Sequence, residues 1–97
     1  MGTYITLSNW TADGLKNVRA TVDRLDAGVE LAARYGVTEK QMYWTLGPYD
    51  MVFVGEAADD ESYSAYLLDV SSRGAINTTT LRAYDREEMR RLLARLG

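Results

Sequence analysis

Residues 42–54 read MYWTLGPYDMVFV, and this stretch decides the fold of the chain. Two runs rich in apolar and aromatic residues, Met42 to Leu46 and Met51 to Val54, are typical of β-strands. Between them stands Gly47-Pro48-Tyr49-Asp50. Glycine permits positive φ and proline fixes φ near about −65°, so this break predicts a tight turn. We therefore expect a β-hairpin in the middle of the chain.

Alternating and helical periodicities lie on both sides of this hairpin. Near the N-terminus, Ile5 and Leu7 alternate with Tyr4 and Trp10, which predicts a strand with the two pairs on opposite faces. Apolar residues spaced three and four apart indicate helices. The first such stripe comprises Leu15, Val18, Val22, Leu25, Val29, Ala32 and Ala33. The last comprises Met89, Leu92, Leu93 and Leu96.

Capping residues and glycines set the expected boundaries. The predicted elements are a strand over 3–10, a helix from Thr11 or Asp13 to Gly36 that breaks near 20–22, strands over 37–46 and 49–57, a helix from 59–61 to 74, a strand over 75–84, and a last helix after Asp85. This βαββαβ order predicts an α+β, ferredoxin-like fold with a four-stranded antiparallel sheet and helices on one face. At 97 residues the chain suits a single domain, 1–97, with the last helix as an addition.

One face of that sheet has no cover within the chain. Met51 to Val54 is apolar at consecutive positions, so both faces of this strand favour burial. Tyr4 and Trp10 are expected on the uncovered face, where exposure of aromatic rings to water is unfavourable. The simplest cover is a second copy packed sheet to sheet, so we expect a homodimer or higher homo-oligomer.

Composition excludes several classes of function. The chain has no Cys and no His, which removes disulfides, thiol chemistry, the commonest general base and the commonest metal ligand. The net charge of −3 disfavours nucleic acid as a ligand. No signal peptide or membrane-spanning run is visible, so we expect a cytoplasmic protein without membrane contact. No cofactor is expected, and no metal either, because Asp50 and Glu56 lack a third carboxylate close in sequence.

Several separate blocks of the chain resemble the GYD-domain family, small bacterial proteins named for a Gly-x-Tyr-Asp-type hairpin, here Gly47-Pro48-Tyr49-Asp50. The other matching blocks are YITLSNWT at 4–11, RLDA at 24–27, YWTLG at 43–47, EA at 56–57 with DDE at 59–61, and TTTLRAY at 78–84. The resemblance implies a dimeric α/β-barrel fold, shared with cofactor-free monooxygenases, decarboxylases and small-ligand sensors, and no particular activity. Ala20-Thr21 departs from it, because the family often has a helix-starting proline there.

Asp50 is the candidate catalytic residue. As a carboxylate at the mouth of a cleft beside the sheet, it would accept a proton or orient a polar ligand. The alternative is a turn residue whose oxygens accept hydrogen bonds from backbone amides.

Aromatic and amide side chains near the hairpin complete the candidate ligand-binding set. An aromatic wall would hold a flat organic molecule, whereas the alternative is a subunit interface, in which Tyr and Trp are enriched. For Asn9 the alternative to ligand binding is capping of the following helix. The candidate ligand-binding residues are Asn9, Trp10, Tyr43, Trp44, Tyr49 and Asp50.

Two functions from different classes are compatible with these residues. The first is an oligomeric module that binds a small organic ligand or another protein through a cleft near the hairpin. The second is a cofactor-independent monooxygenase- or decarboxylase-like enzyme acting on an aromatic small molecule, with Asp50 as base. The arginines at 82, 86, 90, 91 and 95 alternate with acids, which predicts a solvated helix face.

Overall fold

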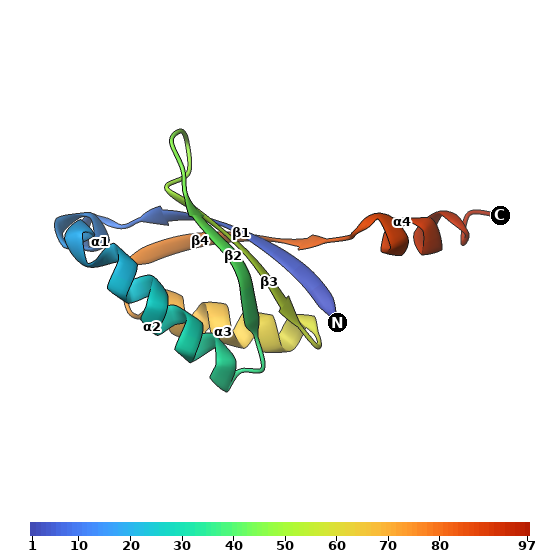
Figure 1. Cartoon of the computed structure of the whole chain (residues 1–97), viewed down its shortest axis with the longest axis horizontal. Helices are drawn as coiled ribbons and strands as arrows, with labels where there is room; N and C mark the ends of the chain where they lie inside the picture. Colours follow the sequence, from blue (N-terminus) through green and yellow to red (C-terminus); the bar gives the residue numbers. More distant parts are fainter.

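The computed structural model describes residues 1–97, and Figure 1 shows a single sheet with helices packed against it. In chain order the elements are β1 (Gly2–Trp10), α1 (Ala12–Lys16), a short 3₁₀ turn η1 (Val18–Ala20), α2 (Thr21–Arg34), β2 (Thr38–Trp44), β3 (Met51–Ala57), α3 (Asp60–Ser72), β4 (Ile76–Ala83) and α4 (Arg86–Leu93). This is the predicted order of strands and helices, including the predicted break before α2.

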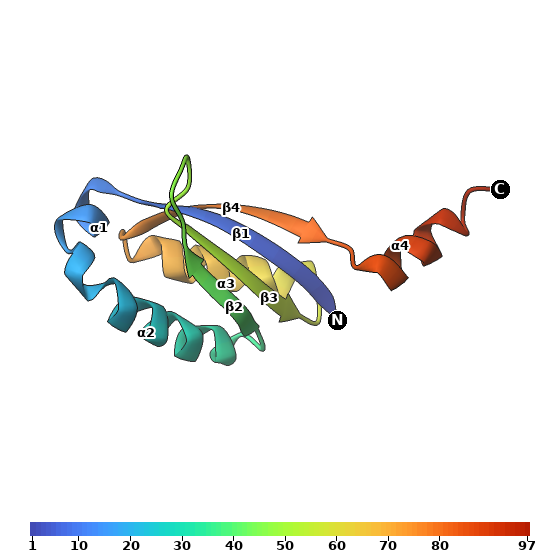
Figure 2. The same ribbon diagram turned by 45° about the horizontal axis from the view of Figure 1, so that its top comes forward.

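The strands lie in the order β2-β3-β1-β4, and every neighbouring pair is antiparallel. The helices α2 and α3 cross one face of this sheet, whereas the other face carries no element of the chain (Figure 2). We call these the covered face and the open face. The predicted α+β, ferredoxin-like architecture is confirmed.

Side-chain caps and glycines account for most boundaries. Thr11 caps α1 by accepting the Gly14 amide at 3.1 Å, and Asp59 caps α3 by accepting the Ser62 amide at 2.8 Å. At α4, Asp85 and Glu88 accept each other's backbone amides in a capping box.

The loop between β2 and β3 is longer than the predicted four-residue turn. Because β2 ends at Trp44 and β3 begins at Met51, it runs from Thr45 to Asp50. Gly47 has a φ of 135°, a conformation that other residues rarely adopt. The Thr45 amide donates to the Asp50 carbonyl at 2.8 Å and closes the loop, whose tip projects beyond the sheet (Figure 1).

The faces of β1 are the reverse of those predicted. Tyr4 lies on the covered face, where its ring stacks on Tyr63 of α3 with centroids 4.3 Å apart and its hydroxyl donates to Asp60 at 2.5 Å. Ile5 and Leu7 therefore point to the open face. A tyrosine packs under a helix at little cost when the helix supplies an acceptor for its hydroxyl.

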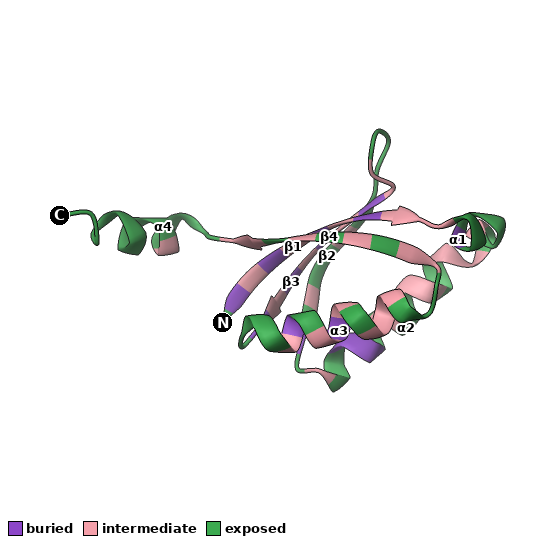
Figure 3. Ribbon diagram, turned by 180° about the vertical axis from the view of Figure 1, so that it is seen from behind, coloured by how far each residue is buried: buried purple, intermediate pink, exposed green.

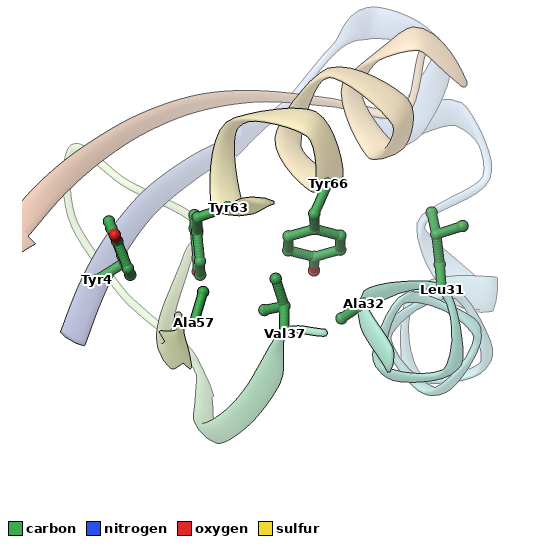
Figure 4. Packing of buried hydrophobic residues seen from close by; sticks show 7 residues of the cluster. All are labelled: Tyr4, Leu31, Ala32, Val37, Ala57, Tyr63 and Tyr66. Atoms are coloured by element: carbon green, nitrogen blue, oxygen red, sulfur yellow. The ribbon is translucent and has the colours of Figure 1, made fainter. Parts of the chain in front are cut away.

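The core is small and centred on tyrosines. Figure 4 shows the cluster between the sheet, α2 and α3, which comprises Tyr4, Leu31, Ala32, Val37, Ala57, Tyr63 and Tyr66. Tyr66 meets the edge of Tyr63 at 5.6 Å between centroids. The predicted stripe of α2 is partly wrong, because Val22 and Val29 are exposed and Leu31 is buried instead.

The last helix lies apart from the rest of the molecule. α4 continues past the end of β4, away from α2 and α3 (Figures 1 and 3). Its apolar stripe is left in solvent: Met89, Leu92, Leu93 and Leu96 are between 38% and 71% exposed. None of the helices has the length and apolar character needed to cross a bilayer.

Candidate functional site

The β2–β3 loop is fastened to the end of β1 by reciprocal hydrogen bonds. The Asn9 side-chain oxygen accepts from the Asp50 amide at 3.1 Å, and the Asp50 carboxylate accepts from the Trp10 amide at 3.0 Å. The Asp50 amide also donates to the Ser8 carbonyl at 2.9 Å. The structure thus brings together Asn9 and Asp50, two residues that the sequence placed in one candidate site.

This arrangement supports the turn alternative for Asp50. One carboxylate oxygen is engaged with a backbone amide, and the side chain is half-buried beside the loop that it holds. Fastening a loop to a neighbouring strand is a common use of Asp and Asn, because their short side chains reach nearby backbone amides.

The predicted aromatic residues do not line one cavity. Tyr43 of β2 pairs with Val52 of β3, and both side chains lie on the open face. Trp44, the next residue on β2, points to the covered face, where its indole nitrogen donates to the Thr21 hydroxyl at 3.1 Å. Trp10 lies at the far end of β1, opposite Ile76. Tyr49 lies in the loop, where its carbonyl accepts from the Thr45 hydroxyl at 2.6 Å.

An apolar pocket lies elsewhere, between α2 and α3 over the covered face. It has a volume of about 280 Å³, and its lining includes Leu25 and Gly28 of α2, Phe53 of β3, and Tyr66 of α3. None of the six candidate ligand-binding residues, Asp50 included, is part of this lining. The pocket between α2 and α3 is therefore not the cleft near the hairpin that the sequence suggested.

A buried carboxylate beneath α3 was missed by the sequence analysis. Glu39 of β2 accepts from the Tyr63 hydroxyl at 3.1 Å through Oε1, while its Oε2 has no hydrogen-bond partner. The carboxylate occupies the space over Gly55, where an added Cβ would lie 3.1 Å from Oε2. Burial raises the pKa of Glu39, and the hydroxyls of Tyr63 and Tyr66 act in the opposite direction.

The tyrosines of this cluster are poor bases. Burial is the largest cause that raises the pKa of Tyr63 and of Tyr66, and the charge of Glu39 adds to it. Burial likewise raises the pKa of Tyr4 to about 12, with help from the hydrogen bond to Asp60. These phenols therefore remain neutral donors near neutral pH, and they hold the core together without offering a phenolate.

The open face of the sheet is an apolar surface. Its side chains at the centre come from three strands in register, because Ile5 pairs with Val54 and Leu7 with Val52. Leu81 lies opposite Ile5 on the other side and is 50% exposed. The open-face residues with apolar side chains are Ile5, Leu7, Tyr43, Val52, Val54, Leu81 and Ala83.

A family model described as the GYD domain matches residues 4–93 of this chain. The "Glutamine synthetase and cystathionine beta-lyase binding protein" of Thermus thermophilus is 38% identical over 84 residues, which are 86% of this chain and 88% of that protein.

Solved structures agree in fold. TTHA0845 of Thermus thermophilus superposes with a TM-score of 0.57 at 24% identity, covering 88% of this chain and 95% of that one. A hypothetical protein of Pyrococcus horikoshii, PHS023, gives a TM-score of 0.57 at 19% identity, covering 89% and 93%. At these identities the likeness concerns architecture alone.

Replacing Asp50 tests the fastening of the loop. Asp50→Ala should lower the free energy of unfolding by about 1–3 kcal/mol, because it leaves the Trp10 amide without its acceptor. Asp50→Asn retains an acceptor oxygen at the same place and should cost less. Urea unfolding measures both, with Asp26→Ala on the exposed side of α2 as the control. Equal stability of Asp50→Ala and the wild type would refute this role.

Replacing Glu39 tests the buried carboxyl. Because its pKa is raised in the folded chain, its stabilising contribution is fully present below the ordinary glutamate value of about 4.3 and is lost as pH rises through the raised value. Glu39→Gln should therefore be more stable than the wild type at neutral pH, and the difference should shrink toward about pH 4. Urea unfolding between about pH 4 and 7 measures the difference in the free energy of unfolding between Glu39→Gln and the wild type. Glu30→Gln, on the exposed side of α2, is the control. A difference that does not vary with pH would contradict the assignment.

Proposed function

This chain belongs to the GYD domain family, and we propose that it is a self-assembling module that binds other proteins. The observation that carries this proposal is the apolar open face. Valine, isoleucine and leucine side chains in register across three strands favour burial, and no other part of the chain covers them.

A second copy suits this face better than an unrelated protein. A flat sheet face packs against an identical one across a two-fold axis, each copy burying the same residues. Burial of about 1,000 Å² of apolar surface at about 25 cal/mol per Å² would contribute about 25 kcal/mol before the costs of association are subtracted. The polar side chains that share the face, Thr3, Glu56 and Thr79 among them, lie toward its ends and edges.

α4 supplies a separate surface for a different partner. Its exposed apolar stripe is flanked by Arg86, Arg90, Arg91 and Arg95, of which only Arg90 is paired, with Glu87 at 2.9 Å. An amphipathic helix of this kind binds in an apolar groove with an acidic rim. The name of the Thermus relative, which describes binding to two enzymes, supports protein partners in general, and the choice of α4 rests on its exposed stripe and arginines.

The alternative enzyme has less support. A cofactor-independent enzyme needs a proton acceptor in a dry pocket. Asp50 instead faces the Trp10 amide and does not line the cavity, and the tyrosines have raised pKa values.

Assembly through the open face is tested by Val54→Lys. Val54 lies at the centre of this face, so a buried ammonium group should dissociate the oligomer, while the single chain keeps its fold. Sedimentation velocity at micromolar concentration should show a dimer or larger species for the wild type and a monomer for the variant. Val29→Lys, on an exposed valine of α2, is the matched control and should sediment like the wild type. A monomeric wild type would overturn the proposal of self-assembly.

Partner binding through α4 is tested by Leu93→Glu. Purified glutamine synthetase and cystathionine beta-lyase from the same organism as this chain are the probes, and biolayer interferometry is the readout. We expect binding by the wild type and a loss of about tenfold or more in the variant, because truncation or charge at a central apolar contact is costly.

The control for this experiment is Leu68→Glu, the same change at an exposed leucine of α3. It should bind as the wild type does. Absence of binding by the wild type to both enzymes would refute these partners. Unchanged binding by Leu93→Glu would place the contact outside α4, and a changed sedimentation of Leu93→Glu would place α4 in self-assembly instead.

A further inference from the structure

The cavity between α2 and α3 is on the side of the sheet away from the proposed assembly surface. Its floor includes Met42 and Phe53, and its walls include Leu25 and Leu31 of α2 and Val70 of α3. Its volume of about 280 Å³ is just below the range for small-molecule sites, about 300–1,000 Å³. The pocket is partly open to solvent, so a ligand can enter it between the two helices.

A glycine in the middle of α2 keeps this space open. Gly28 lines the cavity, and a Cβ added there would meet no atom within 4 Å. In contrast, Gly14 of α1 has a steric reason to be glycine, because a Cβ there would lie 2.0 Å from the Ala75 carbonyl oxygen. Glycine within a helix costs about 0.5–1 kcal/mol relative to alanine. No packing contact requires glycine at Gly28, and a larger side chain there would have room to extend over the cavity.

The charges at the cavity are all positive. Arg24 of α2 and Arg73 of α3 are the two charged residues of the lining, and no carboxylate belongs to it. Arg73 is already paired with Asp69 at 3.2 Å. Arg24 makes no ion pair and is half-buried, and its one hydrogen bond is a long one, 3.4 Å, to the Gly14 carbonyl.

We infer that this cavity binds a small amphipathic monocarboxylate, whose apolar body lies over Phe53 and Gly28 and whose carboxylate pairs with Arg24. An apolar lining with one unsatisfied cation selects this chemistry, because the lining excludes polar bodies and the guanidinium supplies a bidentate partner for a carboxylate. This binding site goes beyond the proposed protein-binding role and does not depend on it.

Isothermal titration calorimetry with decanoate and decanol tests the site. The two probes share their chain and differ in the charge of the head, so decanoate should bind the wild type more tightly. Arg24→Gln should weaken decanoate binding by about tenfold and leave decanol unchanged, because only the charged head uses the guanidinium. Gly28→Leu should fill the cavity and abolish the binding of both probes. Tight decanoate binding that Arg24→Gln leaves intact would refute the role of the arginine.

Matched variants separate this site from other apolar surfaces. Ala33→Leu adds the same side chain to the exposed side of α2 and should bind decanoate as the wild type does. Val54→Lys alters the open face and should also leave decanoate binding unchanged, whatever its effect on assembly. Circular dichroism checks that Gly28→Leu is folded. If it is not, Gly28→Ala, which meets no atom, replaces it and should weaken binding. Wild-type binding of decanoate by a folded Gly28→Leu variant, or no binding by the wild type at millimolar concentration, would overturn the inference.

Discussion

The stack of Tyr4 on Tyr63 is the contact on which the rest of the arrangement depends. It joins the central strand β1 to α3, with ring centroids 4.3 Å apart, and hydrogen bonds at both ends reinforce it: Tyr4 to Asp60, and Tyr63 to Thr6 and Glu39. Because side chains alternate along a strand, a Tyr4 that faces α3 sends Ile5 and Leu7 to the opposite side. The side chains of Ile5 and Leu7 are on the open face because Tyr4 takes the covered face, where its hydroxyl is hydrogen-bonded.

Local signals in the sequence were enough to predict the order of the elements and where three of the helices begin, whereas the strand ends beside the β2–β3 loop were wrong. Thr11, Asp59 and Asp85 cap helices because their side chains bond amides a few residues away, and such contacts depend little on the rest of the fold. The faces of β1 could not be predicted in the same way. Ile5 and Leu7 are the more apolar set, which made the opposite assignment the natural one. The buried set, Tyr4, Thr6 and Ser8, has polar groups, and Tyr4 and Thr6 find hydrogen-bond partners on α3, Asp60 and Tyr63, 56 and 57 residues distant in sequence.

In the candidate site too, contacts between neighbouring elements could be predicted only in part. Asn9 and Asp50 were expected together and lie together, because Asn9 is near the end of β1 and Asp50 is the last residue of the adjacent β2–β3 loop. Glu39 was not expected to be buried, because a β-bulge between Glu39 and Gln41 shifts the alternation of β2. The cavity was not foreseen either, since its lining comes from both helices and three strands and not from a motif.

The position of α4 also separates charge along the molecule. Four arginines and two glutamates give residues 86–97 a formal charge of +2, which leaves −5 for residues 1–85 out of the total of −3. The single chain measures 53 Å along its longest axis, with α4 at one end (Figure 1). Opposite charges so far apart make a large electric dipole, which would rotate the approaching molecule so that its helical end leads toward an acidic surface before any contact forms.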